Sequence, residues 1–306
     1  MSNIINRYPT KVHPPRTILP TKWQKTIQKP VFGILHNVPI IRPTHIFERE
    51  WDTHILLDGC RVDALQLFED EYSFLSNINS IYSVGSSSHS WMEETFSRKY
   101  RDILKSTSYI TGNVNSKEYA PLERSFGYLD EVWKYKWNQD HGTVLAESIT
   151  DRAIKVCRER HPEKLLIHYM QPHFPSVSDP LSYQNQIFDE TSRSIWEMLS
   201  EDEIDKVRVW KSYIENLKYV LDQVQVLLNN IDSDQVVISA DHSNLFGEWN
   251  IYGHPYNIPA PKLRRVPWVV TSASDSGRYE PTIKKPSSTE SSERDVDSML
   301  KDLGYK

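Results

Sequence analysis

The chain has 306 residues, of which 38% are apolar and 11% aromatic, so it can build one large domain or two small ones with a substantial core. Its formal net charge at pH 7 is −5 and it contains no basic block, which makes nucleic acid a poor default partner. The two cysteines, Cys60 and Cys157, form neither a metal-spaced pair nor a disulfide framework, so we expect a cytoplasmic protein.

Neither end of the chain has the pattern of a membrane segment. No apolar run approaches the about 20 residues that span a bilayer, and the N-terminus lacks the apolar core of a secretion signal. Residues 1–44 are rich in Pro, Lys, Arg and Thr and are predicted to form an extended arm. Residues 45–280 hold the predicted main domain, and residues 281–306 a polar linker with a short helix around Asp295–Leu303.

Strands and helices are predicted to alternate through the main domain. The clearest helix is an apolar stripe at helical spacing from Trp210 to Ile231. The other expected elements are strands at His54–Leu57, Ser80–Val84, Ser108–Thr111, Lys164–Tyr169, Val236–Ala240 and Val266–Thr271, and helices at Arg61–Glu69, Trp91–Tyr100 and Val144–Arg160. This alternation predicts a three-layer α/β/α sandwich with a mainly parallel central sheet.

Polar residues follow four of the predicted strands where each strand ends. Asp58 closes the first strand, and the small-residue loop Gly85–Ser88 follows the second. His168 and His173 lie at and beyond a later strand end, and Asp241-His242 ends another. Because ligands of open α/β sheets bind outside the carboxyl ends of the strands, these groups are predicted to meet at one edge.

Asp241-His242 is the strongest candidate for a metal site. Carboxylate oxygen and imidazole nitrogen suit a divalent cation such as zinc or manganese. Neighbouring strand residues point to opposite faces, so both can bind one ion only if the backbone turns after Ala240. The alternative is a loop aspartate beside a packed histidine. Asp58 is either a metal ligand or a cap of the following helix.

The serine loop and the two histidines also allow two interpretations each. A hydroxyl within Gly85–Trp91 is either a nucleophile or an ordinary helix N-cap. His168 and His173 either contact a phosphate or sulfate ester and its leaving oxygen or are satisfied polar residues.

These segments, in this order, resemble the sulfatase-like members of the alkaline phosphatase superfamily. The resemblance covers roughly Trp51 to Tyr305 and rests on five segments: Trp51–Asp63, Gly85–Phe96, His168–Pro175, Ser239–Pro255 and Val266–Trp268, with Leu303-Gly304-Tyr305 closing the pattern. It implies an alkaline-phosphatase-like fold and a catalytic domain at residues 45–280.

The resemblance also implies a set of site residues. One divalent ion (manganese, zinc, calcium or magnesium) would be held by Asp58, Asp241, His242 and a loop hydroxyl. We favour Ser87 as that hydroxyl and as the nucleophile, with Ser88 next. Three histidines would contact the ester group or its leaving oxygen: His173, His254 and, with a weaker case, His168.

The serine loop departs from the pattern of true sulfatases. They use a formylglycine made from Cys or Ser in a Cys/Ser-x-Pro/Ala-Ser-Arg context, whereas here the loop reads Ser87-Ser88-His89-Ser90-Trp91. The resemblance therefore implies a metal-dependent hydrolase of phosphate or sulfate esters with an unmodified serine. The ester is a small molecule or is linked to a glycan or lipid.

Three other functions stay open at this point. The first is transfer of a phosphoryl-linked group, as in the lipoteichoic acid synthase and phosphoethanolamine transferase relatives. The second is a non-catalytic binding protein that keeps the fold. The third, a two-metal phosphodiesterase or mutase, would need a second ligand set that the sequence does not supply. The oligomeric state is not predicted.

Overall fold

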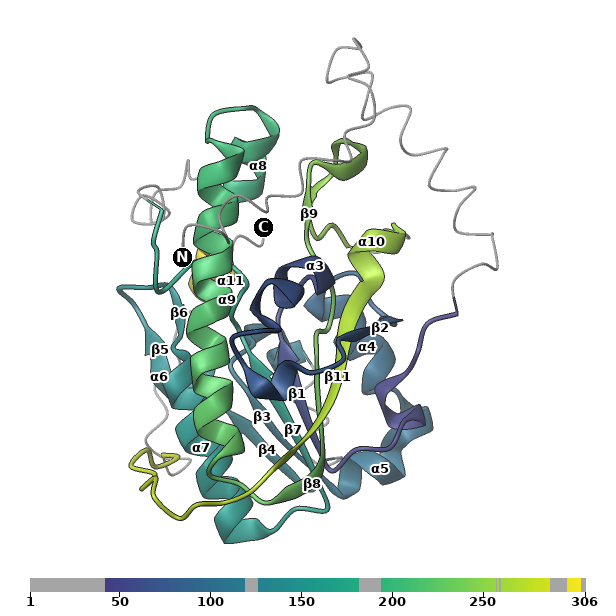
Figure 1. Cartoon of the computed structure of the whole chain (residues 1–306), viewed down its shortest axis with the longest axis vertical. Helices are drawn as coiled ribbons and strands as arrows, with labels where there is room; N and C mark the ends of the chain where they lie inside the picture. The colour runs from purple at the N-terminus through teal and green to yellow at the C-terminus, as the bar shows by residue number, and fades with distance from the viewer. Residues whose placement is uncertain are drawn as a thin grey trace.

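A seven-stranded sheet forms the centre of the molecule (Figure 1). The computed structural model describes residues 42–118, 126–181, 194–256, 258, 260–286 and 296–303. The strands lie in the order β2-β11-β8-β1-β7-β3-β4. Their bounds are β1 Thr53–Leu57, β2 Asn79–Tyr82, β3 Thr107–Thr111, β4 Tyr128–Glu131, β7 Lys164–Tyr169, β8 Ser233–Ser239 and β11 Arg265–Ala273. Neighbouring strands pair in parallel, except that β11 pairs antiparallel with both β8 and β2.

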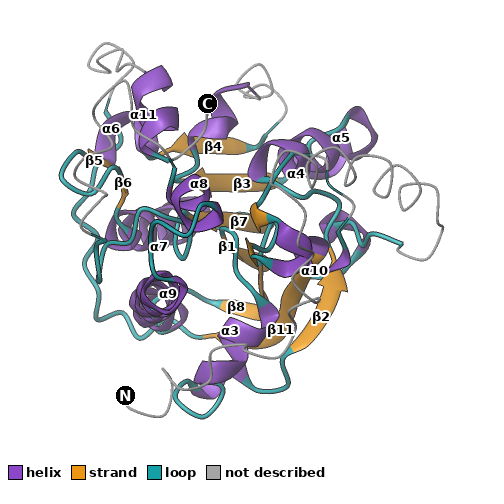
Figure 2. Ribbon diagram, turned by 90° about the horizontal axis from the view of Figure 1, so that it is seen from above, coloured by secondary structure: helices purple, strands orange, loops and turns teal. Residues whose placement is uncertain are grey.

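Helices cover both faces of this sheet (Figure 2). The main helices are α7 (Ala146–Arg160) and α9 (Lys206–Leu228) on one face, and α4 (Ser88–Thr95) and α5 (Arg101–Lys105) on the other. The shorter α-helices are α3 Val62–Leu65, α6 Trp133–Lys136, α8 Ile195–Ser200, α10 Pro261–Arg264 and α11 Val296–Asp302. Two-residue strands pair as β5 (Trp137–Asn138) with β6 (Thr143–Val144) and β9 (Leu245–Phe246) with β10 (Tyr252–Gly253). Short 3-10 helices occur at Ile46–Glu48, Gln66–Phe68, Ser73–Leu75, Arg98–Tyr100 and Glu248–Asn250.

The sequence of β1 explains why it lies at the centre of the sheet. Its five residues are all buried, because helices cover it on both sides. Ile55 and Leu57 pack in the core that includes α7 and α9, whereas Leu56 packs in the core that includes Trp91 of α4. The strand alternation thus divides one apolar run between two cores and fixes the direction in which Asp58 leaves the sheet.

The predicted α/β/α architecture with its mainly parallel sheet is confirmed, and two differences have physical reasons. The strand β4 was not predicted, because its sequence contains Asp130 and Glu131. Asp130 is fully buried and is paired with Arg152 of α7, whose Nε donates to it over 2.8 Å. The helix predicted to begin at Trp91 begins at Ser88 instead, because Ser87 caps it.

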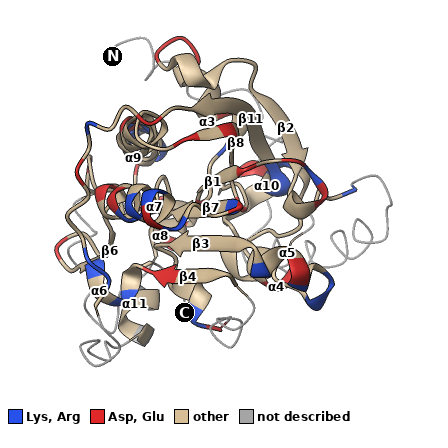
Figure 3. Cartoon of the chain, turned by 90° about the horizontal axis from the view of Figure 1, so that it is seen from below, with Lys and Arg blue, Asp and Glu red and all other residues tan. Residues whose placement is uncertain are grey.

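The chain ends predicted from the sequence are only partly described. The predicted arm, residues 1–44, lies outside the described residues except for 42–44. Residues 281–286 of the predicted linker have neither helix nor strand, and α11 lies within the range predicted for the last helix. Among the described helices, none combines the length and apolar character that a bilayer crossing requires. Acidic and basic residues are interspersed around the sheet, as Figure 3 shows.

Asp302 gives the attachment of α11 a predicted pH dependence. Burial raises the pKa of Asp302 to about 6 from 3.8, although a hydrogen bond with Trp137 acts in the opposite direction. The folded state therefore prefers the protonated carboxyl. Its stabilising contribution is complete below pH 3.8 and is lost as the pH rises through about 6.

We expect Asp302→Asn to unfold at a higher denaturant concentration than the wild type at pH 7, with the difference vanishing near pH 4. Urea unfolding at both pH values measures this, with the exposed Asp70 as a matched control in Asp70→Asn. An equal difference between wild type and Asp302→Asn at both pH values would contradict the prediction.

Candidate metal centre and active site

Two buried aspartates meet at the carboxyl ends of two adjacent strands. Asp58 follows β1, and Asp241 lies just beyond β8, the strand that pairs with β1 in parallel. Both side chains are fully buried. Asp241 Oδ1 accepts hydrogen bonds from the backbone N–H of Gly59 over 3.1 Å and of His242 over 2.9 Å. The ends of parallel neighbours therefore bring two carboxylates into one small space, as predicted.

His242 turns its ring toward the same space. The backbone has left β8 at this point, so Asp241 and His242 do not point to opposite faces. The ring contacts the Ser243 carbonyl oxygen through Nδ1 at 2.9 Å. A carbonyl can only accept, so Nδ1 carries a proton and the lone pair of the neutral ring is on Nε2. That Nε2 lies 3.5 Å from Asp58 Oδ1 and 3.5 Å from Asp241 Oδ2.

The donor set fits a divalent metal ion. Asp58 Oδ1 and Asp241 Oδ2 are buried and accept no hydrogen bond from the described residues, which is costly for carboxylates unless a cation compensates them. One ligand atom from each of Asp58, Asp241 and His242 lies within 4.8 Å of the others. Two carboxylate oxygens and one imidazole nitrogen suit zinc or manganese. The cluster could therefore hold one divalent ion.

The electrostatics of the two carboxylates agree with this assignment. Burial, followed by the neighbouring Asp241 carboxylate, raises the pKa of Asp58 to about 7. Burial also opposes ionisation of Asp241, but His242, His168 and the Gly59 N–H favour its anion and hold its pKa below the usual range. Without a cation, Asp241 is thus the carboxylate that ionises more readily, and its negative charge makes ionisation of Asp58 less favourable.

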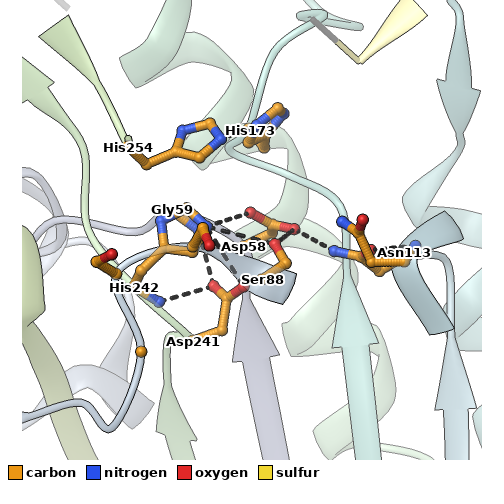
Figure 4. A network of polar contacts seen from close by, with 12 residues as sticks. Asp58, Gly59, Ser88, Asn113, His173, Asp241, His242 and His254 are labelled. Carbon is orange, nitrogen blue, oxygen red and sulfur yellow. Dashed lines mark hydrogen bonds and ion pairs between the residues drawn. The ribbon is translucent and has the colours of Figure 1, made fainter. Parts of the chain in front are cut away.

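Ser88, rather than Ser87, supplies the hydroxyl that faces this cluster (Figure 4). Ser88 Oγ donates to Asp58 Oδ2 over 3.1 Å and lies 3.3 Å from His242 Nε2. Ser87, which the sequence analysis favoured, is the N-cap of α4, and its Oγ accepts from the backbone N–H of Ser90. Because the cap residue and the first helical residue point in different directions, only one of the two hydroxyls meets the carboxylates.

Two of the three predicted histidines lie together above the cluster (Figure 4). The Nε2 atoms of His173 and His254 are 3.3 Å apart, and the ring of His254 stacks on that of His242 with centroids 4.6 Å apart. His173 follows β7, and its ring contacts the Phe174 carbonyl through Nδ1. Burial lowers the pKa of His173. The pKa of His254 is lowered well below its usual value by burial and then by the neighbouring rings of His242 and His173.

His168 lies in a different environment from the other two. Its ring is fully buried within the sheet, with Nδ1 3.0 Å from the Tyr109 hydroxyl. Its Nε2 is 3.7 Å from Asp58 Oδ2 and from Asp241 Oδ2. His168 therefore contacts the carboxylates from the core and is placed to orient them, which differs from the predicted contact with substrate.

Two asparagines at the site were not identified from the sequence. Asn113 donates from Nδ2 to Asp58 Oδ2 over 2.7 Å, and Asn244 donates from Nδ2 to the Gly59 carbonyl over 2.9 Å. The signal for Asn113 was present, since it comes two residues after the predicted strand Ser108–Thr111. The signal for Asn244 was its position in the loop after His242. Asparagine is common in loops for reasons unrelated to ligand binding, so the sequence pattern alone does not distinguish either position as part of a site.

Gly59 permits the close approach of these loops. Its φ is +67°, in the region that glycine adopts most readily. A Cβ at this position would lie 2.4 Å from Asn244 Nδ2, so the buried Asn244 amide would have to move. Glycine at position 59 thus suits both the backbone turn after Asp58 and the close approach of the loop that carries Asp241 and His242.

Comparison with known families gives one match that covers well over half of the chain. The model of the family described as Sulfatase matches residues 80–298. The matched range includes the serine loop, Asp241 and His242 but begins after Asp58. No curated protein matches this sequence significantly.

The fold is similar to several solved structures. The soluble domain of lipooligosaccharide phosphoethanolamine transferase A from Neisseria meningitidis has a TM-score of 0.52 and 14% identity, covering 73% of this chain and 76% of that chain. The integral membrane protein of that name from the same organism has a TM-score of 0.50 and 14% identity, covering 84% of this chain. The match spans 56% of that longer chain. A protein in the alkaline phosphatase superfamily from Vibrio parahaemolyticus has a TM-score of 0.44 and 12% identity, covering 92% of this chain and 75% of that chain.

We expect a divalent cation to stabilise the folded protein through the two buried carboxylates. At a free concentration about 100 times the Kd, binding to the folded state alone adds about 2.7 kcal/mol to the free energy of unfolding. Thermal unfolding of metal-stripped protein with and without zinc or manganese measures this. Asp241→Asn should abolish most of the shift, because it removes the charge but keeps the shape of the ligand.

An exposed carboxylate serves as the control for this experiment. Asp70→Asn should leave the cation-induced shift unchanged, since Asp70 is exposed and is not one of the clustered ligand residues. A shift of the same size in Asp241→Asn and the wild type would mean that the ion binds elsewhere.

Proposed function

This chain belongs to the sulfatase family, and from that premise we propose that it cleaves phosphate esters through a covalent ester on Ser88. The family model and the alkaline-phosphatase-like fold support an enzyme of this superfamily. The observation that carries the proposal is the hydroxyl of Ser88, which contacts both Asp58 and His242. A nucleophile held against two metal-ligand side chains needs no separate general base of the Ser-His type.

The ligands of the ion in this proposal are Asp58, Asp241 and His242, with Ser88 Oγ as the fourth group. A bound divalent ion would supply neutralisation of the ester's charge and a lower pKa for the serine hydroxyl. Asn113 holds Asp58 Oδ2 by a 2.7 Å hydrogen bond, so the other oxygen, Oδ1, is the one left to face the ion.

The residues of the chain define a two-step path for the transferred group. Ser88 Oγ attacks phosphorus while its proton passes to Asp58 Oδ2. The bond from phosphorus to the leaving oxygen breaks, and that oxygen takes up a proton from the His173–His254 pair. In the second step, water or an acceptor alcohol attacks the phosphoserine and its proton passes to the same histidine pair. The bond from phosphorus to Ser88 Oγ then breaks, and Ser88 Oγ recovers its proton from Asp58 Oδ2. His173 and His254, whose Nε2 atoms lie together above the cluster, are the residues placed to contact the leaving and attacking oxygens.

Hydrolysis and group transfer have equal rank in this proposal. The sequence favoured hydrolysis, but two similar folds belong to proteins described as phosphoethanolamine transferases. Phosphate is preferred to sulfate because the loop Ser87–Trp91 lacks the context in which formylglycine is made. A small-molecule, glycan-linked or lipid-linked ester is the proposed substrate, and the cytoplasmic location stays a prediction from the sequence.

Ser88→Ala and Ser87→Ala form a matched pair that tests the nucleophile. We expect Ser88→Ala to lower turnover of p-nitrophenyl phosphate by about 10³-fold or more, because the attacking oxygen is lost. Ser87→Ala should retain activity within about tenfold and lose about 1 kcal/mol of stability, because it removes only a helix cap. Initial rates and thermal melts of both variants measure these effects.

Mass spectrometry of acid-quenched protein extends this test. A phosphoryl group should be found on Ser88 in the wild type during turnover. Phosphorylation of Ser87, or full activity of Ser88→Ala, would contradict the assignment. A protein that binds metal but cleaves neither phosphate nor sulfate esters would instead be the non-catalytic binding protein.

An acceptor alcohol separates hydrolysis from transfer. If the second step is transfer, adding glycerol should raise the rate of nitrophenol release and yield glycerol phosphate in place of inorganic phosphate. If the enzyme is a hydrolase, inorganic phosphate should equal nitrophenol at every glycerol concentration. Measuring both products in one reaction gives the ratio directly.

A further inference from the structure

The side chain of Asn244 joins three segments of the site. It is fully buried. Its Nδ2 donates to the carbonyl of Gly59, the residue after Asp58, and its Oδ1 lies 2.9 Å from Nδ1 of His254. Asn244 itself comes two residues after His242. One amide thus connects the loop after β1, the loop after β8 and the segment that carries His254.

The hydrogen-bond partners fix which end of the amide points where. The Gly59 oxygen is a carbonyl and can only accept, so the group that faces it must be the NH₂ of Asn244. The oxygen of the amide then faces His254 and can only accept from it. Nδ1 of His254 must therefore carry a proton, and this holds for the neutral ring and for the charged ring alike.

The backbone of Asn244 is anchored as firmly as its side chain. Arg61 Nη1 donates to the Asn244 carbonyl over 2.8 Å, and the same guanidinium donates to Asp63 and Glu248. The Arg61 side chain is almost fully buried. Because Asp63 and Glu248 hold the guanidinium in place, the Asn244 backbone has an anchor besides the hydrogen bond of its side chain to His254.

We propose that Asn244 is a positioning residue that holds the proton of His254 on Nδ1, so that Nε2 is the atom offered to substrate. Nε2 of His254 is the atom that lies 3.3 Å from Nε2 of His173, above the cluster. With Nδ1 held protonated, the proton exchanged with an attacking or leaving oxygen is the one at Nε2, on the side that faces His173. This catalytic consequence rests on the proposed function, whereas the position of the proton does not.

The position of the proton can be measured directly in the wild-type protein. Long-range ¹H–¹⁵N spectra of ¹⁵N-histidine-labelled, zinc-saturated protein distinguish the two neutral tautomers by their nitrogen shifts. The signal of His254 is assigned by its loss in His254→Gln. We expect the pattern of a ring protonated on Nδ1. A ring protonated only on Nε2 would overturn the proposal, and no turnover is needed for either result.

Two variants of Asn244 separate the effect on His254 from a merely structural effect. Both Asn244→Asp and Asn244→Leu lose the donor to Gly59. Asn244→Asp keeps an acceptor for His254, so its ring should stay protonated on Nδ1. Asn244→Leu offers no acceptor, so a population protonated on Nε2 should appear. Equal His254 spectra in the two variants would contradict a role for the acceptor.

Kinetics give the second readout of the same pair. Removing a residue that orients a site group typically costs about 10- to 100-fold in activity. We expect that loss in kcat for Asn244→Leu, with KM changed less, and a smaller loss for Asn244→Asp. Asn79→Asp is the control, since Asn79 is exposed and its amide donates to the nearby Asn77 carbonyl. A larger loss in Asn244→Asp than in Asn244→Leu would overturn the proposal.

If no phosphate ester is cleaved by the wild type, the proposed function fails while the spectra still decide the place of the proton. If esters are cleaved but His254 is protonated on Nε2, the proposed function stands and the role of Asn244 fails. The two conclusions are therefore tested independently.

Discussion

The architecture of the site follows from two negative charges buried side by side. Asp58 and Asp241 leave adjacent parallel strands at the same edge of the sheet and are shielded from water. Within the part of the chain that the structure describes, each keeps one oxygen without a hydrogen bond. Burying a carboxylate costs several kcal/mol unless a cation or hydrogen bonds compensate it. A fold that brings two of them together, and completes the set with a histidine nitrogen, has the groups that could hold a divalent ion, and such an ion would stabilise it.

The surrounding residues hold the remaining oxygens so that the free ones face a common point. Asn113 and Ser88 donate to Asp58 Oδ2, and two backbone N–H groups donate to Asp241 Oδ1. These bonds leave Asp58 Oδ1 and Asp241 Oδ2 beside His242 Nε2. The orientation of each ligand is thus determined by neutral donors around it, as is common for the outer contacts of metal sites.

The sequence predicted those parts of the structure that depend on local patterns. Strand ends at Asp58 and Asp241 followed from short apolar runs ending in a charged residue, and their meeting followed from the parallel sheet. The sequence favoured Ser87 over Ser88 as the hydroxyl at the cluster, and the structure places Ser88 there, because Ser87 is the helix cap and pattern alone does not show where the helix begins. Asn113 and Asn244 were missed, since only the folded backbone shows that each amide reaches a ligand segment. The strand β4 was missed because the partner of Asp130, Arg152, lies on a helix further along the chain.

Anomalous diffraction from crystals soaked in zinc or manganese tests the central claim most directly. The account predicts one peak at about 2.0–2.6 Å from Asp58 Oδ1, Asp241 Oδ2 and His242 Nε2, with the Ser88 oxygen beside it. A map in which the ion lies away from these atoms, or binds the Ser87 hydroxyl while Ser88 points elsewhere, would contradict the account.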